Sequence, residues 1–120
     1  MIVDDEKDTV GLVKEILESE GYDTIVAYNG KEALDFLKNV EEKPDLLLLD
    51  MFMPEMSGRK VCEKIRQESS LKDLKVAFFT AAAFRDKGKQ MLKELEVSDY
   101  ITKPFDMDDL LRRVRNIVGE

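Results

Sequence analysis

The chain has 120 residues, enough for one hydrophobic core and too few for two, so we expect a single domain over residues 1–120. Its net charge of −7 argues against direct nucleic-acid binding, and its lack of histidine excludes histidine-based acid–base catalysis and histidine-ligated metals within these residues. No apolar run reaches the ~18 residues that a membrane span needs. The single cysteine, Cys62, permits no internal disulfide, and we expect a cytoplasmic protein without membrane contact.

The first part of the chain alternates between strand and helix patterns. Met1–Val3 reads as the end of a first strand, and Thr24–Ala27 reads as a second. Between them, four apolar residues share one face of a helix that Gly21 ends: Val10, Val13, Ile16 and Leu17. Asn29, followed three residues later by Glu32, is a capping pair for a second helix.

The run Leu46–Leu49 has no polar alternation, so it predicts a strand buried on both faces, and it ends abruptly on Asp50. Val76–Thr80 and Tyr100–Thr102 read as two further strands, and Asp106 caps the last helix. Inward-facing apolar residues mark the three helices of this half: Val61, Cys62 and Ile65; Met91, Leu92 and Leu95; and Leu110, Leu111, Val114, Ile117 and Val118.

Five strands alternating with five helices predict an α/β fold, with a parallel sheet between two helical layers. Polar side chains follow four of the strands where they end. Asp4 and Asp5 follow the first, Asp50 the third, Thr80 ends the fourth, and Lys103 follows the fifth. Ligands of open α/β sheets bind outside the carboxyl ends of the strands, so we expect these groups to form one site.

Three carboxylates at one site repel one another unless a cation lies between them. Mg²⁺ is the natural partner, because it binds one or two carboxylates and keeps waters and phosphate oxygens as its other ligands. An aspartate beside such a metal can attack a phosphoryl group and form an aspartyl phosphate. Lys103 and Thr80 would then stabilise the charge on the transferred group.

These residues resemble the receiver domain of two-component response regulators, and the resemblance spans nearly the whole chain. Four motifs in the right order carry it: Val3-Asp4-Asp5-Glu6; Leu48-Leu49-Asp50-Met51-Phe52-Met53-Pro54 with Gly58; Phe79-Thr80-Ala81; and Lys103-Pro104-Phe105. The resemblance implies a flavodoxin-like, doubly wound five-stranded parallel sheet of order 2-1-3-4-5 with five helices. In that order the first and third strands are neighbours, so all the motifs meet at one edge.

By this resemblance, Asp50 is the phosphoacceptor. Mg²⁺ would be bound by Asp50, directly by Asp5, through water by Asp4, and by the backbone carbonyl of Phe52. Lys103 would pair with the phosphoryl group and with Asp50.

The resemblance also implies a switch. Thr80 would turn toward the phosphoryl group and Tyr100 would turn inward behind it, although an aromatic residue at position 100 is also an ordinary core residue. The peptide bond before Pro104 would be cis.

The implied function is a phosphorylation-dependent switch rather than an enzyme acting on other substrates, since the domain would catalyse only its own phosphorylation and dephosphorylation. A sensor histidine kinase or a phosphotransfer protein would be the donor. A downstream target or an output domain would bind the face made by the fourth helix, the fifth strand and the last helix. The basic run Arg112, Arg113 and Arg115 is either a solvated helix face or part of a partner surface.

Two rival functions use similar chemistry or the same fold. A phosphohydrolase with an aspartate nucleophile commonly has a second acid two residues later, where this chain has Phe52. A flavodoxin-like cofactor carrier needs a phosphate-binding loop after the first strand, where Asp4 and Asp5 would repel the phosphate. Phe52 and Ala82 replace residues that are often polar in receivers, so neither side chain can orient a water molecule, and we expect slow self-dephosphorylation.

Overall fold

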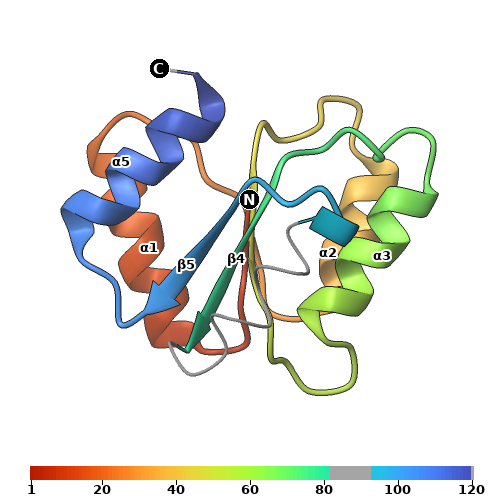
Figure 1. Cartoon of the computed structure of the whole chain (residues 1–120), viewed down its shortest axis with the longest axis horizontal. Helices are drawn as coiled ribbons and strands as arrows, with labels where there is room; N and C mark the ends of the chain where they lie inside the picture. Colours follow the sequence, from red (N-terminus) through yellow and green to blue (C-terminus); the bar gives the residue numbers. More distant parts are fainter. Residues whose placement is uncertain (82–92, 120) are drawn as a thin grey trace.

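A computed structural model describes residues 1–81 and 93–119 of the chain. The described part contains a five-stranded, wholly parallel sheet of order β2-β1-β3-β4-β5, which confirms the predicted α/β class and strand order (Figure 1). The strands are β1 (Ile2–Val3), β2 (Val26–Ala27), β3 (Leu47–Asp50), β4 (Val76–Ala81) and β5 (Asp99–Lys103). The helices are α1 (Lys7–Ser19), α2 (Gly30–Asn39), α3 (Gly58–Gln67) and α5 (Met107–Val118).

The helices form two layers, with α1 and α5 on one face of the sheet and α2 and α3 on the other (Figure 1). The leucine run shows how the sheet separates two cores. Leu47 and Leu49 pack in the core beneath α2 and α3, whereas Leu46 and Leu48 pack in the core beneath α1 and α5. Alternate residues of a strand point to opposite faces, so a strand covered on both sides must be apolar throughout.

The predicted helix boundaries follow from capping interactions. Asn29 Oδ1 accepts a hydrogen bond from the Glu32 amide at 2.9 Å, and Asp106 accepts one from the Asp108 amide at the start of α5. Gly21 follows the C-terminus of α1 with a φ of 88°, a left-handed conformation that glycine adopts without a steric penalty. Asn29 and Asp106 therefore mark the starts of α2 and α5, and Gly21 marks the point where the chain leaves α1.

The structure corrects some predicted boundaries. β4 and β5 each extend one residue beyond the predicted end, because Ala81 pairs with Lys103. β2 is two residues shorter at its start than the predicted Thr24–Ala27, since among the described strands it pairs with β1 alone, and that pairing covers two residues.

The helix count also differs, because the described residues contain four of the five predicted helices. The missing helix was expected through Met91 and Leu92, which lie outside the described residues; residues 93–94 are helical. None of the helices in the described part of the chain is long and apolar enough to cross a bilayer.

Candidate functional site

Three charged side chains meet at the edge of the sheet where the strands end. Asp4 follows β1 and is wholly buried, Asp50 ends β3 and is 5% exposed, and Lys103 ends β5. The Lys103 Nζ atom lies 2.8 Å from Asp4 Oδ2 and 3.7 Å from Asp50 Oδ1. The parallel order places β1 beside β3, so residues 46 positions apart in sequence lie in one polar centre, as the strand-end pattern predicts.

Asp4, Asp5 and Asp50 form a group that fits a hard cation. One carboxylate oxygen from each lies within 4.8 Å of the others, and Asp5 is exposed while the other two are buried. Such an all-oxygen set with an open side is what Mg²⁺ requires when waters and phosphate oxygens complete its shell. Both oxygens of Asp4 already accept hydrogen bonds, one from Lys103 and one from the Glu6 amide at 3.0 Å.

The surroundings of Asp50 disfavour its ionised form, and a bound cation would offset this effect. Burial, followed by the negative charge of Asp4, raises the pKa of Asp50 to about 7, although Lys103 and the Phe52 amide act in the opposite direction. Burial alone would lower the pKa of Lys103, but its hydrogen bond to Asp4 and the nearby carboxylates raise it overall. The lysine therefore stays cationic beside a carboxylate whose ionisation is costly.

Gly58 brings the start of α3 against the end of β3. Its amide donates a hydrogen bond to the Met51 carbonyl oxygen at 2.8 Å, and a Cβ atom at this position would lie 2.2 Å from the Asp50 carbonyl oxygen. No side chain fits that space, so glycine is required for this approach. The glycine in the second motif therefore has a structural role that helps to fix the backbone of Asp50.

The remaining predicted site residues lie around this centre. The Lys103-Pro104 peptide bond is cis, as predicted. The Phe52 amide lies 3.4 Å from Asp50 Oδ1, and its side chain is 53% exposed. The backbone of Thr80 lies in β4 opposite Thr102, while its side chain and residue Ala82 lie outside what the structure describes.

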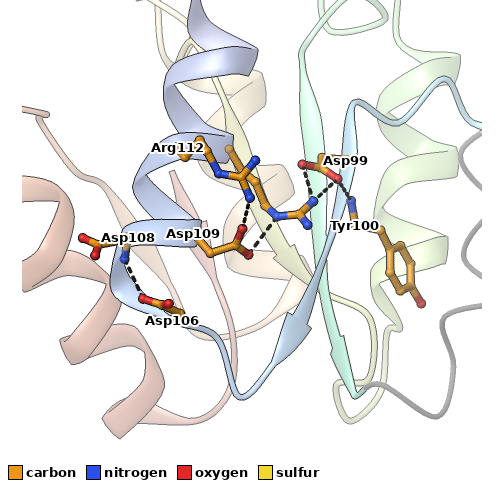
Figure 2. A network of polar contacts seen from close by, with 7 residues as sticks. Asp99, Tyr100, Asp106, Asp108, Asp109 and Arg112 are labelled. Atoms are coloured by element: carbon orange, nitrogen blue, oxygen red, sulfur yellow. Dashed lines mark hydrogen bonds and ion pairs between the residues drawn. The ribbon is translucent and has the colours of Figure 1, made fainter.

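Tyr100 and Asp99 occupy opposite sides of β5, as Figure 2 shows. The Tyr100 side chain points into the core and is 7% exposed, consistent with either the inward switch position or an ordinary core residue. The Asp99 carboxylate faces α5, where Arg113 Nη1 donates to both of its oxygens at 2.8 and 2.9 Å. Arg113 also donates to Asp109 at 2.9 Å.

Sequence reasoning missed three of these contacts. Arg113 is not simply solvated, because it joins α5 to β5, and its spacing of four from Asp109 was the available signal. Glu6 lies 3.6 Å from Lys103 Nζ and adds a further carboxylate to the centre. The Tyr100 hydroxyl donates a hydrogen bond to Met51 Sδ at 3.2 Å, a contact that no local sequence pattern indicates.

Comparisons with known proteins agree with this geometry. Residues 1–115 match the family model described as the response regulator receiver domain. The structure resembles the receiver domain of a signal transduction histidine kinase from Syntrophus aciditrophicus, with 33% identity, a TM-score of 0.85, and coverage of 98% of this chain and 87% of the other.

Two further structures are similar over nearly their whole length. A response regulator receiver domain protein from Methanospirillum hungatei has 36% identity and a TM-score of 0.84, with 99% and 92% of the two chains covered. A chemotaxis response regulator of Vibrio cholerae has 27% identity and a TM-score of 0.86, with 97% and 94% covered. The chain therefore belongs to the family of response regulator receiver domains, the phosphorylation-dependent signalling modules of two-component systems.

Proposed function

We propose that this domain is a Mg²⁺-dependent phosphoacceptor in which Asp50 carries the phosphoryl group. The observation that supports this most strongly is the position of the Asp50 carboxylate, buried at the end of β3 between a second carboxylate and an ammonium group. These surroundings make ionisation of Asp50 costly, because burial and Asp4 outweigh the opposing effect of Lys103, and a strand end with no chemical role has no need of such a site.

The residues that would bind Mg²⁺ are Asp5 directly, Asp50 directly, Asp4 through water, and Phe52 through its backbone carbonyl. The fit rests on three carboxylate oxygens within 4.8 Å of one another. When bound, the metal supplies positive charge to the phosphoryl oxygens and favours the ionised form of Asp50.

In the transfer step an oxygen of ionised Asp50 forms a bond to phosphorus. The bond between phosphorus and the donor's imidazole nitrogen breaks, and its electron pair stays on that nitrogen. Lys103 would pair with the incoming phosphoryl oxygens, and its ammonium group lies 3.7 Å from Asp50 Oδ1. Thr80 would donate a hydrogen bond to another phosphoryl oxygen.

The donor would be a sensor histidine kinase or a phosphotransfer protein in the cytoplasm. Phosphorylation would favour one arrangement of Thr80 and Tyr100 over another, and this would alter the partner surface formed by the helix before β5, by β5 and by α5. A target protein or an output domain would bind there. The domain would act on no other substrate and would not bind nucleic acid directly, in keeping with its net charge of −7.

Incubation with acetyl phosphate, followed by intact-mass and peptide mass spectrometry, tests the assignment. We expect the wild type to gain one phosphoryl group on Asp50 in Mg²⁺ and none in EDTA. The Asp50→Asn variant should not be phosphorylated. The control variant Asp73→Asn changes an exposed aspartate outside the site and should be phosphorylated like the wild type. Labelling of residue 50 in the Asp50→Asn variant, or equal labelling in EDTA, would refute the proposal.

Decay of the phosphorylated protein tests the expected slow self-dephosphorylation. The exposed Phe52 side chain has no polar atom with which to orient an attacking water molecule. We expect loss over minutes or longer, and faster loss in a Phe52→Asn variant, whose amide can hydrogen-bond to water. Loss from the wild type within seconds would contradict this expectation.

A further inference from the structure

The Tyr100 side chain crosses from β5 toward the end of β3. Its ring lies in the core beneath α2 and α3, with its centroid 6.3 Å from that of Phe78 on the intervening strand β4. Its hydroxyl donates a hydrogen bond to Met51 Sδ at 3.2 Å, and both side chains are buried. Met51 directly follows Asp50, so this contact links the aromatic residue to the backbone that carries the central carboxylate.

We propose that Met51 is a positioning residue for Tyr100, because its sulfur accepts the tyrosine hydroxyl and holds the ring inward. A buried tyrosine hydroxyl needs an acceptor, and a thioether accepts hydrogen bonds, although more weakly than oxygen does. An unbranched methionine side chain also adapts its shape to the ring. Leucine occupies a similar volume but has no acceptor, so substitution separates hydrogen bonding from packing.

The backbone of Tyr100 is held independently from the other side of β5. Its amide donates to Asp99 Oδ1 at 2.7 Å, and the same carboxylate is bound by Arg113 of α5. Figure 2 shows the ring of Tyr100 and the carboxylate of Asp99 directed to opposite sides of the strand. Loss of the Met51 acceptor should therefore change the side-chain position of Tyr100 while the main chain of β5 stays in place.

The link from Met51 to phosphorylation rests on the proposed function. If Asp50 is the phosphoacceptor, a shift of the end of β3 on phosphorylation reaches Tyr100 through the adjoining Met51 sulfur. The positioning itself concerns the unphosphorylated protein and does not require phosphorylation to occur.

Fluorine NMR of protein labelled with 3-fluorotyrosine tests the positioning. The chain has three tyrosines, and a Tyr100→Phe variant identifies the resonance of Tyr100. The change in chemical shift between H₂O and D₂O reports exposure of the ring. For the wild type we expect a small change in chemical shift between the two solvents. In Met51→Leu the fraction of molecules with the Tyr100 ring turned outward should rise about threefold, which corresponds to the net free energy of one neutral hydrogen bond. Met53→Leu, at another buried methionine of the same core, should match the wild type.

A Met51→Gln variant separates the acceptor from the shape of the side chain. Glutamine reaches a similar distance and offers an oxygen acceptor, so Tyr100 should stay inward, and circular dichroism verifies that each variant is folded. An unchanged Tyr100 resonance in Met51→Leu would overturn the proposal, as would equal exposure of Tyr100 in Met51→Leu and Met51→Gln. Phosphorylation of Asp50 is measured in a separate mass-spectrometry experiment. A protein that is not phosphorylated there would refute the proposed function, but the NMR result on the position of Tyr100 would still stand.

Discussion

Replacing Asp50 by asparagine should stabilise the domain, and the gain should depend on pH. The folded protein keeps the Asp50 proton up to about pH 7, whereas the unfolded chain loses it near the ordinary pKa of 3.8. Between these values the unfolded state binds fewer protons than the folded state, so the free energy of unfolding of the wild type falls as the pH rises. Asparagine resembles the protonated carboxyl group and avoids this loss.

The size of the effect follows from the same two pKa values. A difference of about 3 units corresponds to about 4 kcal/mol at most, and partial access of water to the site lowers the expected gain to about 2–4 kcal/mol at pH 8. The gain should be near zero at pH 4, grow up to about pH 7 and stay constant above it. Burial and the charge of Asp4 are the physical causes, so the gain should be smaller when Asp4 is neutralised by an Asp4→Asn change.

Urea unfolding followed by circular dichroism in EDTA, at a series of pH values, measures this gain. At a typical slope of about 1–3 kcal/mol per molar urea, the midpoint should shift by about 1 M or more at pH 8. Asp73→Asn serves as the exposed control and should show no such trend. Adding Mg²⁺ should stabilise the wild type more than Asp50→Asn, because ligand binding to the folded state adds to its stability.

Two results would refute the reasoning about Asp50. The first is a gain that stays constant from pH 4 to pH 8, which would mean that ionisation of Asp50 costs nothing in the folded protein. The second is a loss of stability in Asp50→Asn at pH 8, which would mean that the charged carboxylate is favourable in its site and that Lys103 outweighs burial and Asp4.

Three further substitutions test the framework around the site by urea unfolding. Gly58→Ala should lower the free energy of unfolding by about 3 kcal/mol, because the added Cβ would overlap the carbonyl oxygen of the residue that ends β3. The control is Gly11→Ala in α1, where a Cβ meets nothing within 4 Å, and this change should be neutral or stabilise the domain by up to about 1 kcal/mol. Equal losses of stability in the two variants would contradict the steric argument. Asn29→Ala should cost about 1 kcal/mol through loss of the α2 cap, and no change would show that water replaces it. Arg113→Lys should cost about 1 kcal/mol, because the arginine donates from Nη1 to Asp99 and from Nε to Asp109 at the same time, and a single lysine ammonium group cannot reproduce this geometry. Full retention of stability would show that the positive charge alone is sufficient.

The sequence determined the elements and the composition of the site. The leucine run required burial on both faces, and the structure divides its residues between two cores. The capping residues Asn29 and Asp106 mark helix starts through hydrogen bonds within a few residues. Periodicity and capping are local, so they can be read from neighbouring positions. For the same reason, the carboxylates and the lysine were recognisable as strand-end groups.

Only the tertiary structure decided how these groups act on one another. The pKa of Asp50 depends on burial and on the charge of Asp4. The Tyr100 hydroxyl donates to Met51, which is 49 positions away and directly follows β3, a strand that does not neighbour β5. The ion pair of Arg113 with Asp99 likewise joins a helix to a strand. Desolvation and Coulomb interactions depend on distances in space, and strand order sets these distances, which local sequence patterns do not contain.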